Sequence, residues 1–298
     1  MINNQGWINL YKPKNITSFQ ALKIIKKKFN FNKLGHAGTL DPIAEGILPI
    51  AIGKATKLIE YINQDFKKYI FTIDWGAQTT TDDNTGEIIK KSNLIPSKKD
   101  IEDNIINFIG DLEQKPPKVS SVKINGTRAY KLVREKIDFK TKPKKVFVKE
   151  LKLNSITSQT ATFEIECGKG FYVRSLARDF AIKLGTFGHI SGLKRTKVGN
   201  FVTSSSILLD DLVKIGNTQE LINCVIPSIS VLDDILAYEI DNEEDINNLS
   251  LGRTINLDKF NSKYSFKKNK LIFLSNNGDI ISIGKLVGNL FRPNKILI

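Results

Sequence analysis

The sequence is poor in the residues from which metal and thiol sites are built. Its 298 residues include two cysteines, Cys167 and Cys224, and two histidines, His36 and His189. Neither pair has the spacing of a zinc site, and no HExxH motif is present, so we expect no bound metal. Two isolated cysteines are typical of reduced thiols, which predicts a cytoplasmic protein.

Motifs that hold nucleotides or build a nucleophilic serine site are also missing. The chain has no GxxxxGK[ST] loop, no GxGxxG after a strand and no nucleophile elbow. These absences argue against nucleotide-dependent and serine-hydrolase chemistry, and we expect no cofactor. The longest apolar runs, such as Ile47–Ile52 and Ile280–Ile283, are too short to span a membrane, and no signal peptide is readable at the N-terminus.

Negative charge is scarce relative to positive charge. The chain has 45 Lys and Arg against 31 Asp and Glu, a net charge of +14. Residues 233–298 contain nine acidic and nine basic side chains, so the whole excess lies in residues 1–232. This distribution favours two modules that face one polyanion such as nucleic acid, and a lysine-rich solvated surface is the alternative. We predict a large domain over residues 1–232 and a small β-rich domain over 233–298.

Hydrophobic periodicity predicts a mixture of strands and helices. Strands are predicted over Gly6–Tyr11, Leu48–Ile52, Lys68–Trp75, Lys145–Leu153, Ala161–Cys167, Leu271–Leu274 and Ile280–Val287. Helices are predicted over Ser18–Phe29, Ala55–Ile62, Tyr172–Leu184 and, capped by Ser97, up to Gly110. We take Ser18 as the N-cap of the first helix. Because strands and helices do not alternate regularly, the pattern favours an α+β fold over a doubly wound sheet.

The segment richest in information is the fifteen-residue run GHAGTLDPIAEGILP, residues 35–49. Its three glycines and two prolines indicate a backbone held by φ constraints rather than by a helix or a ladder of strands. Such a loop can present the Asp41 carboxylate and the His36 imidazole in a defined geometry. Taken alone, an Asp before Pro is usually a turn former, and a loop histidine usually bonds to backbone. Asp41 is nevertheless the best candidate for a nucleophile or base.

Four further segments add to this loop. They are KPKNITS at 12–18, KYIFT at 68–72 with GAQTTTDDNTG at 76–86, QKPPKVSSVK at 114–123 with GTRAY at 126–130, and CGKGFYVRSL at 167–176. In this order, together with the loop at 35–49, they resemble the TruB family of tRNA pseudouridine synthases. The resemblance covers about residues 6–201, and the tail looks like the PUA-type domain that follows in that family.

The resemblance implies specific roles for individual residues. Asp41 would be the catalytic aspartate, Tyr69 would stack on the target base and take part in proton transfer, and Arg174 would pair with Asp41. A bidentate arginine contact would hold the carboxylate ionised and oriented. His36 would help to hold the flipped nucleotides. The other candidates for substrate binding are Lys12, Pro13, Thr17, Lys123, Arg128 and Tyr130.

The resemblance also implies a reaction and a fold. We expect isomerisation of uridine to pseudouridine at position 55 in the T loop of tRNA, by base flipping, without cofactor or metal, in a monomer. The pseudouridine synthase fold has a mixed, mainly antiparallel sheet flanked by helices. Two alternatives remain: an RNA-binding or tRNA-folding protein without catalysis, and a guide-RNA-dependent relative. The simple tail and the retention of the three catalytic candidates favour the stand-alone enzyme.

Two of these candidates have a plain structural explanation as well. Tyr69 shares its strand register with Phe71 and Ile73, so it can be a core aromatic, and Arg174 can belong to an exposed basic helix face. The sequence also departs from the family pattern at Asn15, Thr80, Val119, Gly168 and Phe171. Asn15 stands where glycine is usual, and we expect the turn to survive because asparagine tolerates positive φ.

Overall fold

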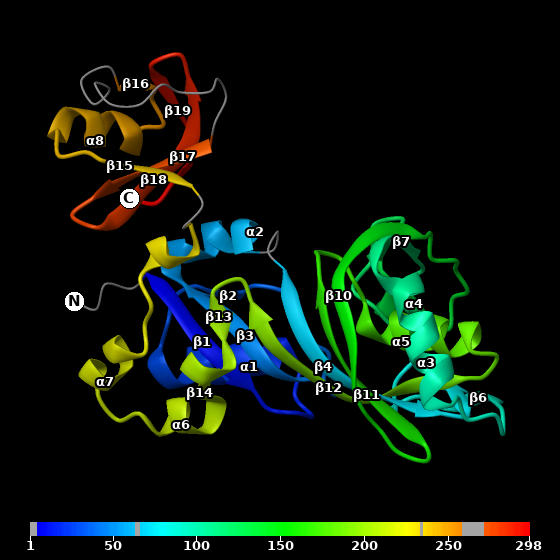
Figure 1. The fold of residues 1–298 in the computed structure, drawn as a ribbon. Helices are drawn as coiled ribbons and strands as arrows, with labels where there is room; N and C mark the ends of the chain where they lie inside the picture. The colour runs from blue at the N-terminus through cyan, green and yellow to red at the C-terminus, as the bar shows by residue number, and fades with distance from the viewer. Residues whose placement is uncertain (1–4, 63–65, 233–234, 258–270) are drawn as a thin grey trace.

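A large mixed sheet organises most of the chain. The computed structural model describes residues 5–62, 66–232, 235–257 and 271–298 (Figure 1). The strands of the large sheet are β1 (Gly6–Lys12), β2 (Leu34–His36), β3 (Glu45–Ile52), β4 (Lys67–Trp75), β7 (Gly110–Gln114), β10 (Lys144–Ile156), β11 (Thr160–Cys167), β12 (Gly188–Val198), β13 (Phe201–Val202) and β14 (Ile207–Leu208). Their order is β14-β1-β3-β12-β4-β11-β10-β7, with β2 beside β3 and β13 beside β12.

Most neighbours in this sheet are antiparallel. Among the strands that the structure describes, the parallel pairs of this sheet are β1 with β14 and β3 with β12. The other pairings are antiparallel. The predicted mixed, mainly antiparallel sheet is therefore confirmed.

Helices and short hairpins lie between these strands and after them. The helices are α1 (Ser18–Phe29), α2 (Ile59–Ile62), α3 (Lys98–Ile105), α4 (Ala129–Arg134), α5 (Val173–Lys183), α6 (Leu209–Lys214), α7 (Thr218–Asn223) and α8 (Glu243–Ser250). The two small hairpins are β5 (Ala77–Thr79) with β6 (Ile88–Lys91), and β8 (Lys123–Ile124) with β9 (Thr127–Arg128). No helix in the described part of the chain is long and apolar enough to cross a membrane.

The alternating pattern of β4 builds the core under the middle of the sheet. Phe71 and Ile73 are each 1% exposed, as the sequence pattern predicts. The Phe71 ring stacks on Phe163 of β11 at 5.3 Å between centroids, and Phe163 meets Phe180 of α5 edge-on at 5.6 Å. These contacts bury the apolar stripe of α5 against the sheet.

The first helix spans the predicted residues, but its N-cap lies one residue earlier than the sequence predicts. Thr17, not Ser18, is the N-cap: its hydroxyl accepts from the Gln20 backbone NH at 3.0 Å, and the Gln20 side chain accepts from the Thr17 NH at 2.7 Å. The Ser18 hydroxyl is buried and instead bonds both the NH and the carbonyl of Leu40, at 2.9 and 3.1 Å. The prediction was wrong because both residues have capping hydroxyls, and only their orientation distinguishes them.

Two other predicted helices are only partly α-helical. The predicted helix Ala55–Ile62 is a 3₁₀ helix over Gly53–Leu58 followed by the single turn of α2. The helix has Ser97 as its N-cap, as predicted, in a capping box with Asp100, but it tightens to 3₁₀ over Ile106–Phe108 before β7 starts. Such tightening is common at helix ends, and apolar periodicity alone does not reveal it.

The C-terminal part forms a second sheet. Its strands are β15 (Leu236–Glu239), β16 (Ile255–Asn256), β17 (Leu271–Asn276), β18 (Asp279–Val287) and β19 (Leu290–Ile296), in the order β15-β17-β18-β19-β16. This confirms a β-rich tail. The boundary predicted between residues 232 and 233 touches residues 233–234, which lie outside the described residues, and it stays a prediction.

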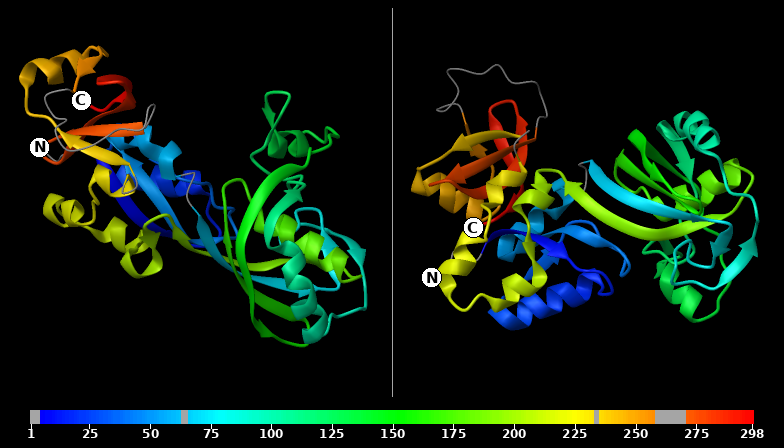
Figure 2. Two further views of the ribbon diagram at one scale, coloured as in Figure 1. Left: turned by 45° about the horizontal axis from the view of Figure 1, so that its top comes forward. Right: turned by 60° about the horizontal axis from the view of Figure 1, so that its bottom comes forward.

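The second sheet packs against the end of the large sheet that carries α2, away from α3, α4 and α5 (Figures 1 and 2). Phe273 and Ile283 of the small sheet share one buried cluster with Trp7 and Leu58 of the large part. The Lys295 ammonium also donates to the Lys57 carbonyl at 2.8 Å. A common apolar core therefore joins the two parts.

Candidate active site

Asp41 and Arg174 form an ion pair although 133 residues separate them in the sequence. Asp41 lies in the glycine-rich loop between β2 and β3, and Arg174 lies in the first turn of α5. The Arg174 Nε donates to Asp41 Oδ2 at 2.8 Å. The side chain of Arg174 is 4% exposed and that of Asp41 is 34% exposed. The arginine is therefore held inside the protein while the carboxylate remains open to a bound molecule.

The guanidinium of Arg174 is anchored on all three nitrogens. Nη1 donates to the Thr81 carbonyl at 2.9 Å, and Nη2 donates to the Val119 carbonyl at 3.0 Å. Asp83 Oδ2 lies 3.7 Å from Nη1. The contact with Asp41 is thus a single charge-assisted hydrogen bond and not the bidentate contact expected from the sequence. The backbone carbonyls bind Nη1 and Nη2 and hold the side chain in one orientation, so that only Nε serves Asp41.

Tyr69 of β4 stands opposite Arg195 of β12 in the sheet register, and the Arg195 guanidinium lies within electrostatic reach of the Tyr69 phenol. Tyr69 is partly exposed, whereas the next inward residues of its strand are buried. Burial raises the pKa of the Tyr69 phenol, and the Arg195 guanidinium opposes this effect. The Asp41 charge also raises this pKa, since Tyr69 lies within its electrostatic reach. The phenol is therefore protonated at neutral pH.

Arg195 is a site residue that the sequence reading missed. It is 1% exposed, and it donates from Nε to the Ile47 carbonyl at 2.7 Å and from Nη2 to the Gly38 carbonyl at 2.8 Å. It therefore links the position opposite Tyr69 to both sides of the loop that carries Asp41. The sequence did contain a signal for it. Arg195 follows the apolar Leu193 by two residues, so in a strand the two side chains lie on the same, inward face.

The strands β3 and β12 approach each other closely beside Arg195. Gly46 of β3 pairs with Arg195 of β12, and a Cβ at Gly46 would lie 2.2 Å from the Arg195 carbonyl oxygen. The φ of Gly46 is +107°, a conformation that residues with side chains rarely adopt. A glycine is thus required where the two strands that flank the site meet.

Lys12, predicted to bind substrate, is fully buried. Its ammonium donates to the carbonyls of Pro13 and Ile16, both at 2.8 Å, and thereby closes the turn that follows β1. Asn15 in this turn has a φ of +65°, which confirms that it adopts the conformation usual for glycine. The Asn15 NH donates to the Pro42 carbonyl at 2.8 Å, which places the turn beside Asp41. The observed contacts of Lys12 are those of a supporting residue.

Replacing Lys12 by methionine should remove a pH dependence of stability. Burial lowers the pKa of Lys12 from 10.5 to about 8, although Asp41 opposes the shift. Between these values the unfolded chain binds more protons than the folded one, so the free energy of unfolding contributed by Lys12 rises with pH. At about 1.4 kcal/mol per unit, the difference between wild type and K12M should change by about 2–3 kcal/mol from about pH 8 to pH 10. Urea unfolding of both proteins measures it, and a constant difference would contradict the assignment.

His36 ends β2 and is partly exposed. Its Nδ1 is buried and has no hydrogen-bond partner among the residues described. Burial, and to a lesser extent the charge of Arg195, lowers the pKa of His36. The imidazole is therefore neutral at neutral pH, and it carries a polar atom that no protein group satisfies.

The remaining candidates lie on two short segments. Lys123 and Arg128 are exposed on the hairpin β8–β9, and Tyr130 in α4 is partly exposed. The Tyr130 NH donates to the Ser120 carbonyl at 3.0 Å, next to the Val119 carbonyl that binds Arg174. The hairpin is thus connected to the Asp41 site through residues 119–120. Of the other two predicted residues, Pro13 is partly buried, and Thr17 has the capping role given above.

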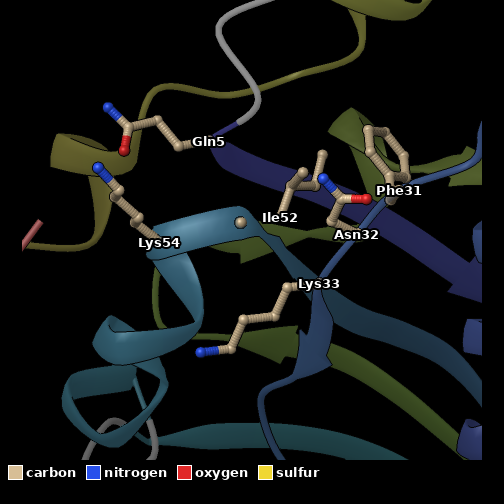
Figure 3. A pocket seen from close by; sticks show the side chains of 7 residues that line it. Gln5, Phe31, Asn32, Lys33, Ile52 and Lys54 are labelled. Atoms are coloured by element: carbon tan, nitrogen blue, oxygen red, sulfur yellow. The ribbon is translucent and has the colours of Figure 1, made fainter. Parts of the chain in front are cut away.

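A separate surface cavity of about 330 Å³ lies near the start of β1 (Figure 3). It is lined by Gln5, Phe31, Asn32, Lys33, Ile52, Gly53 and Lys54. Asp41, Tyr69 and Arg174 are not among its lining residues, so it is not the site described above. In the described part of the chain, no three His, Cys, Asp or Glu side chains are grouped as ligands for a metal ion.

Comparison with known proteins identifies the family. The model for the TruB family pseudouridylate synthase N-terminal domain matches residues 26–173, and that for the tRNA pseudouridylate synthase B C-terminal domain matches residues 174–235. The tRNA pseudouridine synthase B of Ehrlichia ruminantium (strain Gardel) is 42% identical over 294 residues, 98% of each chain. The chain belongs to the TruB family. This confirms the family predicted from the motifs and the enzyme class, tRNA pseudouridine synthase.

Further relatives and solved structures agree with this membership. The tRNA pseudouridine synthase B of Caulobacter sp. (strain K31) is 42% identical over 251 residues, 84% of this chain and 81% of that protein. A chain of a Cbf5-Nop10-Gar1 complex superposes with a TM-score of 0.75 at 22% identity, over 99% of this TruB family chain and 85% of the other. That likeness confirms the predicted pseudouridine synthase fold.

Proposed function

We propose that this TruB family protein converts uridine 55 in the T loop of tRNA to pseudouridine, with Asp41 as the nucleophile. The observation that carries the proposal is the partly exposed Asp41 carboxylate held by the buried Arg174 beside Tyr69. The tRNA substrate has support from the relatives, which are named as tRNA pseudouridine synthases. A cytoplasmic location, a monomeric state and a PUA-like tail stay predictions.

The reaction suits a site built from these side chains. The N1–C1′ bond of uridine breaks and a C5–C1′ bond forms, while C5 loses a proton and N1 gains one. Atoms and electrons balance within the substrate, so the reaction needs no oxidant or reductant. A nucleophilic carboxylate can form a transient covalent bond to the substrate, at C1′ or at C6, between the breaking of the first bond and the formation of the second. Arg174 orients the Asp41 oxygen and stabilises its charge in the folded protein.

Access to the base requires that it leave the stack of the T loop. Flipping costs on the order of a few kcal/mol, and stacking on an aromatic ring recovers about 1–3 kcal/mol per base. Tyr69 is partly exposed and lies within electrostatic reach of Asp41, and its phenol stays protonated. We propose that the ring stacks on the flipped uracil and that the phenol takes part in proton transfer.

The surrounding residues supply candidates for RNA contacts. We propose that the neutral imidazole of His36, which is partly exposed at the end of β2, contacts a nucleotide of the T loop. Lys123 and Arg128 present positive charge on a hairpin anchored next to Arg174. Such side chains contact phosphates, which position RNA without reading its sequence.

The proposal is tested with an unmodified tRNA transcript and the purified protein, without guide RNA. We expect pseudouridine at position 55 on mapping, and none in a transcript with cytidine at that position. Pseudouridine elsewhere in the transcript would refute the T-loop assignment. Tight binding without product would favour the RNA-folding alternative, and product only with a guide RNA would favour the guide-dependent one.

A further inference from the structure

We propose that Asp82 and Arg178 are positioning residues for the Arg174–Asp41 pair. They lie outside the groups that face the substrate and act through the backbone that Arg174 binds. The inference rests on the proposed function, because it assumes that the orientation of Asp41 limits the reaction. The proposal stands on the hydrogen bonds around α5.

Arg174 and Arg178 are one helical turn apart, so both side chains project from the same face of α5. Each binds the same two segments. In the loop after β5, Arg174 binds the Thr81 carbonyl and Arg178 Nη1 binds Asp82 Oδ2 at 2.8 Å. In the segment after β7, Arg174 binds the Val119 carbonyl and Arg178 Nη2 binds the Lys115 carbonyl at 2.9 Å. Arg178 therefore holds in place the two segments whose carbonyls orient Arg174.

The backbone at Asp82 makes this double contact possible. Asp82 has a φ of +58°, in the left-handed region that aspartate tolerates better than most residues. Through this turn, the Thr81 carbonyl and the Asp83 carboxylate face Arg174, while the Asp82 carboxylate faces Arg178. Asp83 closes the loop by accepting from the Thr85 NH at 3.0 Å. The adjacent Asp82 and Asp83 thus face different arginines: Asp82 binds Arg178, and Asp83 lies near Arg174.

Both members of the pair are withdrawn from solvent. The side chains of Asp82 and Arg178 are 7% and 14% exposed. Gln78 donates a second hydrogen bond to Asp82 at 3.3 Å, and Asp179 accepts from Arg178 Nε at 2.9 Å. A buried carboxylate without its cation is strongly unfavourable, so loss of one partner displaces the other. The loop that contains Asp82 would then move. The Thr81 carbonyl would move with it, and so would the Arg174 guanidinium that is bonded to this carbonyl.

The expected effect is on the chemical step. A displacement of about 1 Å at a catalytic group can lower a rate about 100-fold. We expect Asp82→Asn to lower the single-turnover rate of pseudouridine formation about 10- to 100-fold. The Kd for tRNA should stay within about threefold, because the removed charge is buried and is not on the β8–β9 hairpin.

Three matched variants separate this role from simpler ones. Asp82→Gly removes the carboxylate but eases the left-handed backbone, so it should be as slow as D82N if the carboxylate is what matters. Asp179→Asn removes a partner of Arg178 that binds neither segment, and it should stay within about twofold of wild type. Arg178→Lys keeps the charge, but its single ammonium cannot reach both Asp82 and the Lys115 carbonyl. Its rate should therefore be lowered as much as that of D82N. The double variant D82N/R178K should be no slower than either single one, because the two residues act as one unit.

Rates and tRNA Kd values are measured for each variant, after a thermal unfolding transition has shown that it is folded. A D82N rate within twofold of wild type would overturn the proposal, as would a wild-type rate for D82G or fully additive losses in the double variant. A parallel loss of tRNA affinity would reassign the pair to binding. If D82N does not fold, R178K alone decides by the same criteria. Absence of product with the wild type would instead reject the proposed function itself.

Discussion

Asp41→Asn is expected to lower the single-turnover rate of pseudouridine formation by at least about 10⁴-fold, the scale seen when a nucleophile is removed. The amide has the shape of the carboxylate, and its oxygen can still accept from Arg174 Nε. The bonds of Arg174 Nη1 and Nη2 to two backbone carbonyls hold the guanidinium in place. Only the charge needed for attack is lost. The Kd for tRNA should therefore change less than about threefold. Rapid-quench kinetics and filter binding measure the two quantities.

Glu45, the first residue of β3, offers a matched control four residues after Asp41. Its carboxylate lies 3.6 Å from the Lys14 ammonium at the surface and is 29% exposed. Glu45→Gln should keep a rate within about threefold of wild type, because its carboxylate has no contact with Arg174. If D41N retained more than about 1% of the wild-type rate, the nucleophile would have to be another group.

Tyr69→Phe is expected to lower the rate about 10²- to 10⁴-fold, the usual contribution of a group that transfers a proton. The phenylalanine ring keeps the stacking surface, so tRNA affinity should be almost unchanged. Tyr69→Ala should in addition weaken tRNA binding by about 1–3 kcal/mol, since it removes the ring. Because the pKa of Tyr69 is raised by burial, wild-type activity should show no loss from this phenol below its ordinary value near pH 10.

Tyr61 is a suitable control for these variants. It lies in α2, next to Lys295 of the second sheet, and its pKa is also raised by burial. Tyr61→Phe should leave both the rate and the tRNA Kd unchanged. A wild-type rate for Y69F would instead support the plain explanation of Tyr69 as a core aromatic.

Local patterns in the chain were sufficient for several structural predictions. Alternation over Lys68–Trp75 predicted a strand with one buried face, and the structure has that strand with Phe71 and Ile73 in the core. Ser97 was predicted to cap a helix, and it is the N-cap of α3. These predictions succeed because the physical cause lies within a few residues of the chain.

Other features depend on contacts between distant residues. The N-cap of α1 is Thr17 because Ser18 turns toward Leu40. Arg174 gives Asp41 one hydrogen bond, because carbonyls from two other segments bind its Nη1 and Nη2. Arg195 escaped notice because its partners lie about 150 residues earlier in the chain.

The sequence by itself determined the family, the enzyme class and the candidates Asp41, Tyr69 and Arg174. Motif order and residue type specify these, since a family pattern is a property of the linear chain. The tertiary structure alone decided how the candidates are held, Arg174 by three segments and Tyr69 opposite Arg195, and it alone revealed the Arg178–Asp82 pair. The physical reason is that a buried donor must find an acceptor, and folding decides which distant carbonyl or carboxylate lies within reach.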